Sequence, residues 1–197
     1  MEKKVRKNLA VLASGSGTTL QAIIDAIESN NLDSKIVVVI SNNQNAYALD
    51  RARKAGIPYF IVDNKSAEEN DESLSRLLRA FNVDLIVLAG YLKKIGPRLL
   101  EEYVIINTHP SLLPKYGGKG MHGMHVHQAV VDNEEKETGV TVHFVDEHYD
   151  HGHIIRQTKV PVYPEDTADD VSARVQAAEK PQLVSVLKDF AEGKINL

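Results

Sequence analysis

All eight histidines of the 197-residue chain fall between His109 and His153, so this window is where acid–base or metal chemistry is expected. The first of them, His109, stands two residues after Asn107 in the octapeptide NTHPSLLP, residues 107–114. The prolines predict a rigid exit from a strand. An amide donor two residues from an imidazole can polarise a carbonyl and move a proton.

The later histidines raise the possibility of a metal site. They form two groups of three within six residues, namely His122, His125 and His127, then His148, His151 and His153. Neither group has the helical His pair with an acid that is typical of metalloproteases. We therefore expect no functional metal, and a histidine metallohydrolase is the minor alternative.

The chain has no Cys, which excludes disulfides, thiolate catalysis and cysteine metal sites. His143 alternates with apolar residues, so a supporting role and a functional role are equally open.

A glycine-rich segment, SGSGTT at residues 14–19, stands between an expected strand and an expected helix. Small residues let backbone N–H groups approach an anion at the helix N-terminus. The third glycine of a dinucleotide fingerprint is replaced by Leu20, and the segment lacks the Gly-Lys of a Walker A loop. The pattern predicts a site for a small phosphate monoester, and the alternative is a tight turn capped by Ser16 or Thr18.

Periodicity in the first half predicts alternating strands and helices. Short apolar segments at 9–13, 36–40, 59–62 and 85–89 are typical of strands buried on both faces, and helical patterns occur at 20–27, 46–55 and 74–81. A βαβαβαβ run predicts a Rossmann-like, doubly wound α/β fold, with a mostly parallel sheet and helices on both faces. With strand order 3-2-1-4, a ligand crevice opens at residues 14–19 and 90–95.

The second half is less regular. We expect a strand at 104–107, an irregular stretch at 110–123, a helix at 126–133, strands at 140–145 and 154–160, and a helix at 167–193 that Pro181 kinks or divides. The segment containing Tyr116 and residues 117–120 is interpreted as a flexible loop. The acids Glu68, Glu69, Asp71 and Glu72 are interpreted as a solvated first helical turn.

Five stretches carry a resemblance to a known family. They are residues 14–24 (SGSGTTLQAII), 88–91 (LAGY), 107–114 (NTHPSLLP), 139–146 (GVTVHFVD) and 173–176 (ARVQ). Together they resemble the 10-formyltetrahydrofolate-dependent formyltransferases, in the branch that formylates glycinamide ribonucleotide. The resemblance covers essentially the whole chain and implies the formyltransferase fold.

The resemblance also implies roles for particular residues. Asn107, His109 and Asp150 correspond to the catalytic trio: Asn107 holds the formyl oxygen, His109 stabilises its charge and moves a proton, and Asp150 orients His109 and accepts the amine proton. The residues implied for the ribonucleotide are Gly15, Ser16, Gly17, Thr18 and Thr19 at the phosphate and Glu179 at the ribose. Those implied for the folate are Leu92, Lys93, Lys94, Ile95, Asn107, Val145 and Asp146.

Four features depart from the usual family pattern. Thr19 replaces Asn in the phosphate loop, Lys93-Lys94-Ile95 replaces Arg-Ile-Leu and makes the folate wall more basic, and His151 replaces a small residue beside Asp150. Lys180-Pro181 after Glu179 is also unusual, which makes Glu179 the weakest of the transferred assignments.

Composition limits the remaining possibilities. Of its residues, 43% are hydrophobic and 25% are charged, and the net charge is -4. The chain has no basic tract, and its longest unbroken apolar runs are five residues long. We expect one formyltransferase domain over 1–197, with ribonucleotide binding in the N-terminal half and folate binding and catalysis in the C-terminal half. We also expect a cytoplasmic monomer or homodimer with no nucleic acid, membrane or tightly bound cofactor, and 10-formyltetrahydrofolate as cosubstrate. The alternatives are a relative acting on another amine, which the length disfavours, and a non-catalytic nucleotide-binding module.

Overall fold

The computed structural model describes residues 6–63 and 66–195. The chain divides into two compact units, one of residues 1–106 with 187–197 and one of residues 107–186. A single domain over 1–197 stays a prediction. The strands run in the order β3-β2-β1-β4-β5-β6-β7, so the first four have the order on which the expected crevice depends.

Four strands build the first unit: β1 (Lys7–Leu12), β2 (Ser34–Ser41), β3 (Tyr59–Ile61) and β4 (Leu85–Leu88). β1 pairs in parallel with β2 and with β4, and β2 pairs in parallel with β3. The side chains of β4 and of residues 9–12 in β1 are buried, as expected for parallel strands covered on both faces. The carboxyl ends of β1 and β4 therefore lie side by side.

β3 corrects the expectation that all four strands are buried. Its residues Tyr59, Phe60 and Ile61 are 41%, 40% and 51% exposed. The strand lies at the edge of the sheet, where only β2 pairs with it. An apolar run does not distinguish an edge strand from a central one, so periodicity alone wrongly predicted that β3 is buried.

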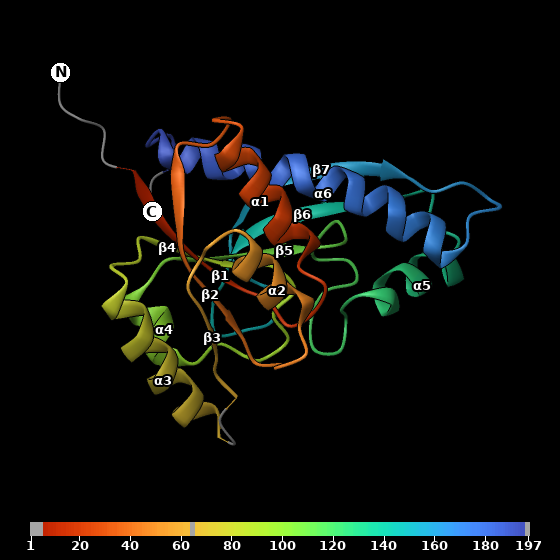
Figure 1. Cartoon of the computed structure of the whole chain (residues 1–197). Coiled ribbons are helices and arrows are strands. Elements are labelled where there is room, and N and C mark those ends of the chain that lie inside the picture. The colour runs from red at the N-terminus through yellow and green to blue at the C-terminus, as the bar shows by residue number, and fades with distance from the viewer. Residues whose placement is uncertain (1–5, 64–65, 196–197) are drawn as a thin grey trace. The chain divides into compact units, whose positions relative to one another are not determined.

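The helices of the first unit form two contacting pairs. α1 (Thr18–Glu28) contacts α2 (Tyr47–Lys54), and α3 (Ala67–Ala80) contacts α4 (Pro97–Glu102). The two pairs lie apart in Figure 1, as expected when crossover helices cover both faces of a doubly wound sheet.

The acidic stretch at the start of α3 is only partly the solvated turn that the sequence predicts. Ser66 caps the helix by accepting from the Glu69 N–H at 3.1 Å, and Glu68 and Glu69 lie in its first turn. Asp71, however, is buried, and its carboxylate accepts from the backbone N–H groups of Gly96 and Arg98 at 3.2 and 3.0 Å. Asp71 thus satisfies the unpaired donors at the start of α4, a tertiary role that local sequence does not reveal.

The second unit is built on an antiparallel pair of strands, β6 (Glu137–Phe144) and β7 (Ile154–Pro161). β5 (Ile105–His109) leads into it, and α5 (Met124–Asp132) follows the irregular stretch after β5. Its core contains a cluster of buried valines: Val130, Val140, Val160, Val171 and Val175. β5 and the β6–β7 connection hold the residues of the candidate active site.

α6 (Ala168–Ala191) is one helix that contains Pro181, so of the two expected outcomes, a kink or a division into two helices, the division is not found. The residue after the proline is held by tertiary contacts, because the Gln182 side-chain amide donates to the Arg156 carbonyl at 2.8 Å. Leu183 and Val184 are buried. Packing of these residues keeps the chain helical after Pro181, although proline lacks the N–H that would donate within the helix. Among the described residues, no helix has the length and apolar character needed to cross a membrane.

Candidate active site

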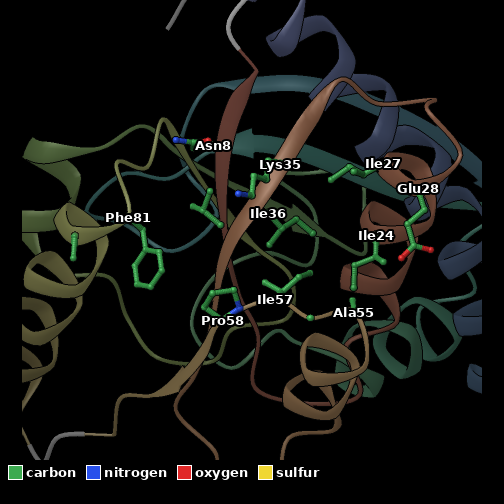
Figure 2. A pocket seen from close by; sticks show the side chains of 13 residues that line it. Asn8, Ile24, Ile27, Glu28, Lys35, Ile36, Ala55, Ile57, Pro58 and Phe81 are labelled. Atoms are coloured by element: carbon green, nitrogen blue, oxygen red, sulfur yellow. The ribbon is translucent and has the colours of Figure 1, made fainter.

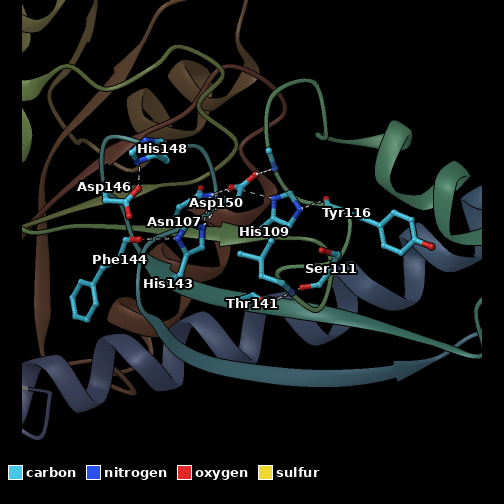
Figure 3. Close-up of polar contacts among 12 residues, drawn as sticks. Asn107, His109, Ser111, Tyr116, Thr141, His143, Phe144, Asp146, His148 and Asp150 are labelled. Atoms are coloured by element: carbon cyan, nitrogen blue, oxygen red, sulfur yellow. Dashed lines mark hydrogen bonds and ion pairs between the residues drawn. The ribbon is translucent and has the colours of Figure 1, made fainter.

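The structure brings together Asn107, His109 and Asp150, all within the second unit (Figure 3). Asp150 Oδ1 lies 3.4 Å from His109 Nδ1 and 3.5 Å from Asn107 Nδ2. Asn107 and His109 are two residues apart on β5, and Asp150 belongs to the connection between β6 and β7. These contacts are at the long end of the hydrogen-bond range, so they can give way to shorter bonds with a reacting group.

The Asp150 carboxylate is held in its charged form. Its side chain is 10% exposed, and this burial alone would raise its pKa. A hydrogen bond from His109, the nearby His143 ring, the His109 charge and the Gly118 N–H outweigh that effect and lower the pKa of Asp150 below its usual range. Its φ of 60° is in the left-handed region, which a non-glycine residue adopts at a cost, often at functional sites.

His109 is buried, and both of its ring nitrogens face acceptors. Nε2 lies 2.8 Å from the Tyr116 carbonyl oxygen, and Nδ1 faces the Asp150 carboxylate at 3.4 Å. A carbonyl oxygen accepts only, so Nε2 must carry a proton. A proton on Nδ1 would face the Asp150 carboxylate.

His143 supports Asn107, which answers the question that the sequence left open. His143 Nδ1 donates to the Phe144 carbonyl at 2.8 Å, so in the neutral ring Nε2 is an acceptor. The Asn107 Nδ2 group lies 3.1 Å from that Nε2 (Figure 3). One amide N–H of Asn107 is therefore used in fixing the orientation of the side chain, and the other faces Asp150 Oδ1 in the long contact of 3.5 Å.

A buried network holds the octapeptide after His109 in place. The Thr141 hydroxyl donates to the Ser111 carbonyl at 2.7 Å and accepts from the Leu113 N–H at 3.1 Å. Gln157 Nε2 adds hydrogen bonds to Thr141 Oγ1 and to the Leu113 carbonyl, both at 2.9 Å. Satisfied buried networks of this kind specify one conformation. The loop that begins at His109 is therefore fixed to β6 and β7.

Backbone groups of residues 116–118 complete the site; the sequence predicts a flexible loop here, which the family resemblance places at the border of the active site. The Tyr116 carbonyl faces His109, and the Gly118 N–H donates to Asp150 Oδ2 at 2.9 Å. The segment was interpreted as a flexible loop because main-chain donors and acceptors leave no residue-type signal. Its four glycines between 117 and 123 were the only indication that the backbone approaches another group closely.

The glycine segment 14–19 lies where the sequence placed it, in the first unit after β1. Gly17 precedes α1 with a left-handed φ of 68°, and no side chain caps the helix, so capping by Ser16 or Thr18 is not found. The Ser14 hydroxyl donates to Asn42 at 2.5 Å and accepts from the Leu92 N–H at 2.9 Å. Ser14 thus joins this segment to residues 90–95, the two sides of the predicted crevice.

Arg51 adds a positive charge beside the glycine segment, and sequence analysis did not single it out. Its Nε donates to the Ser16 carbonyl at 2.8 Å, and its Nη1 donates to Gln21 at 3.0 Å. Its guanidinium also lies 4.9 Å from the centre of the Tyr47 ring. A fixed guanidinium next to a helix N-terminus favours binding of an anion.

We expect Gly17→Ala to weaken binding of a phosphate monoester such as ribose 5-phosphate. An added Cβ would lie 2.7 Å from the Ala48 Cα, so the segment or α2 must move. Loss of one hydrogen bond to a charged group corresponds to about tenfold in affinity, measurable by calorimetry. Gly56→Ala is the matched control, because Gly56 has a similar φ of 67° but no atom near the added Cβ. Equal affinity loss in both variants would show that backbone strain alone is responsible.

The residues implied for folate binding are found in both units. Lys93 forms an ion pair with Asp63 at 2.5 Å, which offsets part of the basic character expected of this wall. The Leu92 side chain is exposed, whereas the Ile95 side chain is buried in the core. In the second unit Asp146 accepts from the His148 N–H at 2.8 Å. Its neighbour Val145 is half-buried.

Glu179 is half-buried on α6, in the second unit, whereas the glycine segment lies in the first. Its contact with a ribose stays a prediction. Lys94 is exposed next to the paired Lys93.

The six later histidines do not assemble as two metal triads. The rings of His122 and His125 are 5.5 Å apart, those of His148 and His151 are 5.8 Å apart, and His153 stacks on Phe144. His127 is buried on α5, where burial and then the His109 charge lower its pKa. Within the described part of the chain, no group of three or more His, Asp or Glu side chains is arranged to hold a metal ion.

A separate groove lies at the other end of the first unit (Figure 2). It has a volume of about 580 Å³ and is lined mainly by apolar side chains, including Ile24, Ile36 and Phe81. Asn8 and Lys35, near the amino ends of β1 and β2, also line it, whereas the glycine segment follows the carboxyl end of β1. None of its lining residues belongs to the predicted site.

Comparisons with known proteins identify relatives over nearly the whole chain. The model of the formyl transferase family matches residues 7–187. The phosphoribosylglycinamide formyltransferase of Haemophilus influenzae is 43% identical over 196 residues, covering 97% of this chain and 90% of the relative. The glycinamide ribonucleotide transformylase 1 structure from Symbiobacterium toebii has a TM-score of 0.91 at 36% identity, covering 98% of this chain and 91% of that one. The phosphoribosylglycinamide formyltransferase from Coxiella burnetii, in complex with CHES, has a TM-score of 0.90 at 38% identity, with 98% and 90% covered. The chain belongs to the formyl transferase family.

Proposed function

We propose that this protein transfers the formyl group of 10-formyltetrahydrofolate to the amine of glycinamide ribonucleotide. The products are formylglycinamide ribonucleotide and tetrahydrofolate, in a step of purine biosynthesis. Relatives named for this activity match nearly the full chain. The observation that carries the proposal is the convergence of Asn107, His109 and Asp150 in the second unit.

The reaction begins when the amine nitrogen attacks the formyl carbon and forms a tetrahedral intermediate. The Asn107 N–H that is not used by His143 donates to the formyl oxygen as its charge develops. One such donor is typically worth about 2.7 to 4 kcal/mol in the transition state. When it carries both protons, the His109 ring stabilises the same charge, and its two N–H groups face the Tyr116 carbonyl and the Asp150 carboxylate.

Collapse of the intermediate needs two proton transfers. The Asp150 carboxylate, ionised because its pKa is lowered, accepts the proton of the attacking amine. His109 gives its Nδ1 proton to the folate nitrogen as the bond between that nitrogen and the formyl carbon breaks. Direct attack of the amine on the formyl carbon needs no covalent enzyme adduct.

Substrate binding is assigned to the segments that the family pattern selects. Residues 15–19 hold the ribonucleotide phosphate, supported by Arg51, and Glu179 contacts the ribose. Residues 92–95 with Val145 and Asp146 bind the folate cosubstrate. Holding both substrates side by side provides the entropic part of the rate acceleration. The partners are thus two small molecules, and the reaction requires no tightly bound cofactor.

A spectroscopic assay of tetrahydrofolate formation with a panel of acceptors tests this proposal. Turnover is expected with glycinamide ribonucleotide and not with methionyl-tRNA or a sugar-nucleotide amine. EDTA is expected to have no effect. Turnover with another amine would move the protein to another branch of the family, and loss of activity with EDTA would favour the metallohydrolase alternative. A well-folded protein with no turnover would contradict the proposal.

A further inference from the structure

One short turn contacts both ionisable residues of the candidate active site. We call residues 116–118 the clamp turn. Its Tyr116 carbonyl faces His109 Nε2 at 2.8 Å, and its Gly118 N–H donates to Asp150 Oδ2 at 2.9 Å. An acceptor for the imidazole and a donor for the carboxylate therefore come from main-chain atoms only two residues apart. The position of this turn determines which protons the His109–Asp150 pair can hold.

The clamp turn adopts a conformation that its first residue does not favour. Tyr116 has a φ of 55°, in the left-handed region, although two glycines follow it directly. Glycine would adopt this conformation without a steric penalty. A non-glycine residue keeps it only where the surrounding structure imposes it. The Tyr116 side chain must therefore contribute contacts that compensate for the strain.

Glu135 supplies the polar part of those contacts. The Tyr116 hydroxyl donates to Glu135 Oε1 at 2.9 Å, and the ring packs against the valine cluster of the second unit. The Glu135 side chain is 22% exposed and also binds Lys115 Nζ at 2.9 and 3.1 Å. The bonds from Lys115 and then Tyr116 lower the pKa of Glu135. The carboxylate therefore fixes two consecutive side chains at the entrance to the turn.

We propose that Tyr116 and Glu135 are positioning residues for His109. The bond between them holds the clamp turn so that the Tyr116 carbonyl keeps a proton on Nε2 of His109. The ring can then carry its second, transferable proton on Nδ1, on the side of Asp150. The inference rests on the proposed function for its catalytic consequence, whereas the effect on the His109 ring is a property of the protein without substrates.

Nitrogen-15 NMR of the histidine rings, recorded without substrates, tests the structural half of the proposal. In the wild-type protein, His109 Nε2 is expected to show the shift of a protonated nitrogen throughout the neutral range. In Tyr116→Phe and Glu135→Ala, a substantial unprotonated fraction is expected at Nε2. Glu135→Gln, whose amide oxygen can still accept from the Tyr116 hydroxyl, is expected to resemble the wild type. An unchanged Nε2 signal in both Tyr116→Phe and Glu135→Ala would overturn the proposal.

Glu137→Ala is the matched control. Glu137 also pairs with a lysine, Lys159 at 2.9 Å, but its side chain is half exposed and contacts no residue of the clamp turn. This control is expected to leave both the His109 signal and kcat at wild-type values. An effect equal to that of Glu135→Ala would show that loss of any nearby carboxylate is sufficient, which would contradict a specific role.

Kinetics test the catalytic half. Tyr116→Phe and Glu135→Ala are each expected to lower kcat about tenfold, as for loss of one hydrogen bond to a charged group, with little change in KM. The double variant is expected to lose no more than either single variant, because both remove the same contact. Additive losses, or losses confined to KM, would overturn the proposal. If the wild-type protein showed no formyl transfer, the proposed function would fail while the NMR result would still decide the role of the clamp turn.

Discussion

His109→Ala is expected to lower kcat for formyl transfer by about 10²- to 10⁴-fold, the range found when a positioned acid–base group is removed. The variant loses the charge beside the formyl oxygen and the proton donor for the folate nitrogen. Affinity for ribose 5-phosphate should stay within about twofold of the wild type, a difference of well under 1 kcal/mol. The glycine segment belongs to the first unit, whereas His109 belongs to the second. Single-turnover kinetics and calorimetry together measure the two effects.

A second variant separates chemistry from packing. The His109 side chain is only 4% exposed, so alanine leaves a cavity that can destabilise the fold. His109→Gln keeps most of the volume and an N–H that can donate to the Tyr116 carbonyl, but it cannot be protonated. It is expected to be as inactive as His109→Ala and more stable. Substantial activity in a stable His109→Gln variant would show that His109 only fills space.

Asp150→Asn is expected to lower kcat by a similar factor, about 10²- to 10⁴-fold, because the amide cannot accept the amine proton or balance the His109 charge. The substitution should be tolerated structurally. Asn adopts the left-handed conformation of position 150, where φ is 60°, more readily than most residues. Its side-chain oxygen can still accept from the Gly118 N–H. Wild-type turnover in this variant would remove Asp150 from the mechanism.

Asp150→Asn is also expected to change how the free energy of unfolding depends on pH. The pKa of Asp150 is lower in the folded protein than its unfolded value of about 3.9. The stabilisation linked to its ionisation is therefore fully present above that unfolded value, and it is lost as the pH falls through the folded pKa. Urea unfolding should show a gap between the wild type and Asp150→Asn at neutral pH that narrows below about pH 4. A gap that widened on acidification would contradict the pKa direction.

Much of the fold could be predicted because its strands are buried in a regular way. The apolar runs at 9–13, 36–40 and 85–89 correspond to β1, β2 and β4, and their alternation with helices predicted the parallel pairing that the structure has. β3 was placed correctly but its exposure was not, because position within a sheet depends on partners that are distant in sequence. The prediction that Asp71 is solvated was wrong for the same reason, since the N–H groups that it binds lie at positions 96 and 98.

The site was predictable only in part. Asn107 and His109 share one strand, so their spacing could indicate a joint role. Asp150 is one of several acids in its loop, and only the family pattern distinguished it from Asp146 and Glu147. The support from His143 depends on the pairing of strands, and the clamp turn acts through main-chain atoms. Neither could be predicted from residue type.

The fate of a labelled formyl group shows whether the protein transfers it directly from the folate to the amine of glycinamide ribonucleotide. 10-Formyltetrahydrofolate carrying carbon-13 in its formyl group is incubated with the protein and glycinamide ribonucleotide, and the products are followed by carbon-13 NMR. The label is expected in the formamide of formylglycinamide ribonucleotide, one equivalent for each tetrahydrofolate formed, and Asp150→Asn is expected nearly to abolish this transfer. Label released as formate, or tetrahydrofolate formed equally well without the amine, would contradict direct transfer.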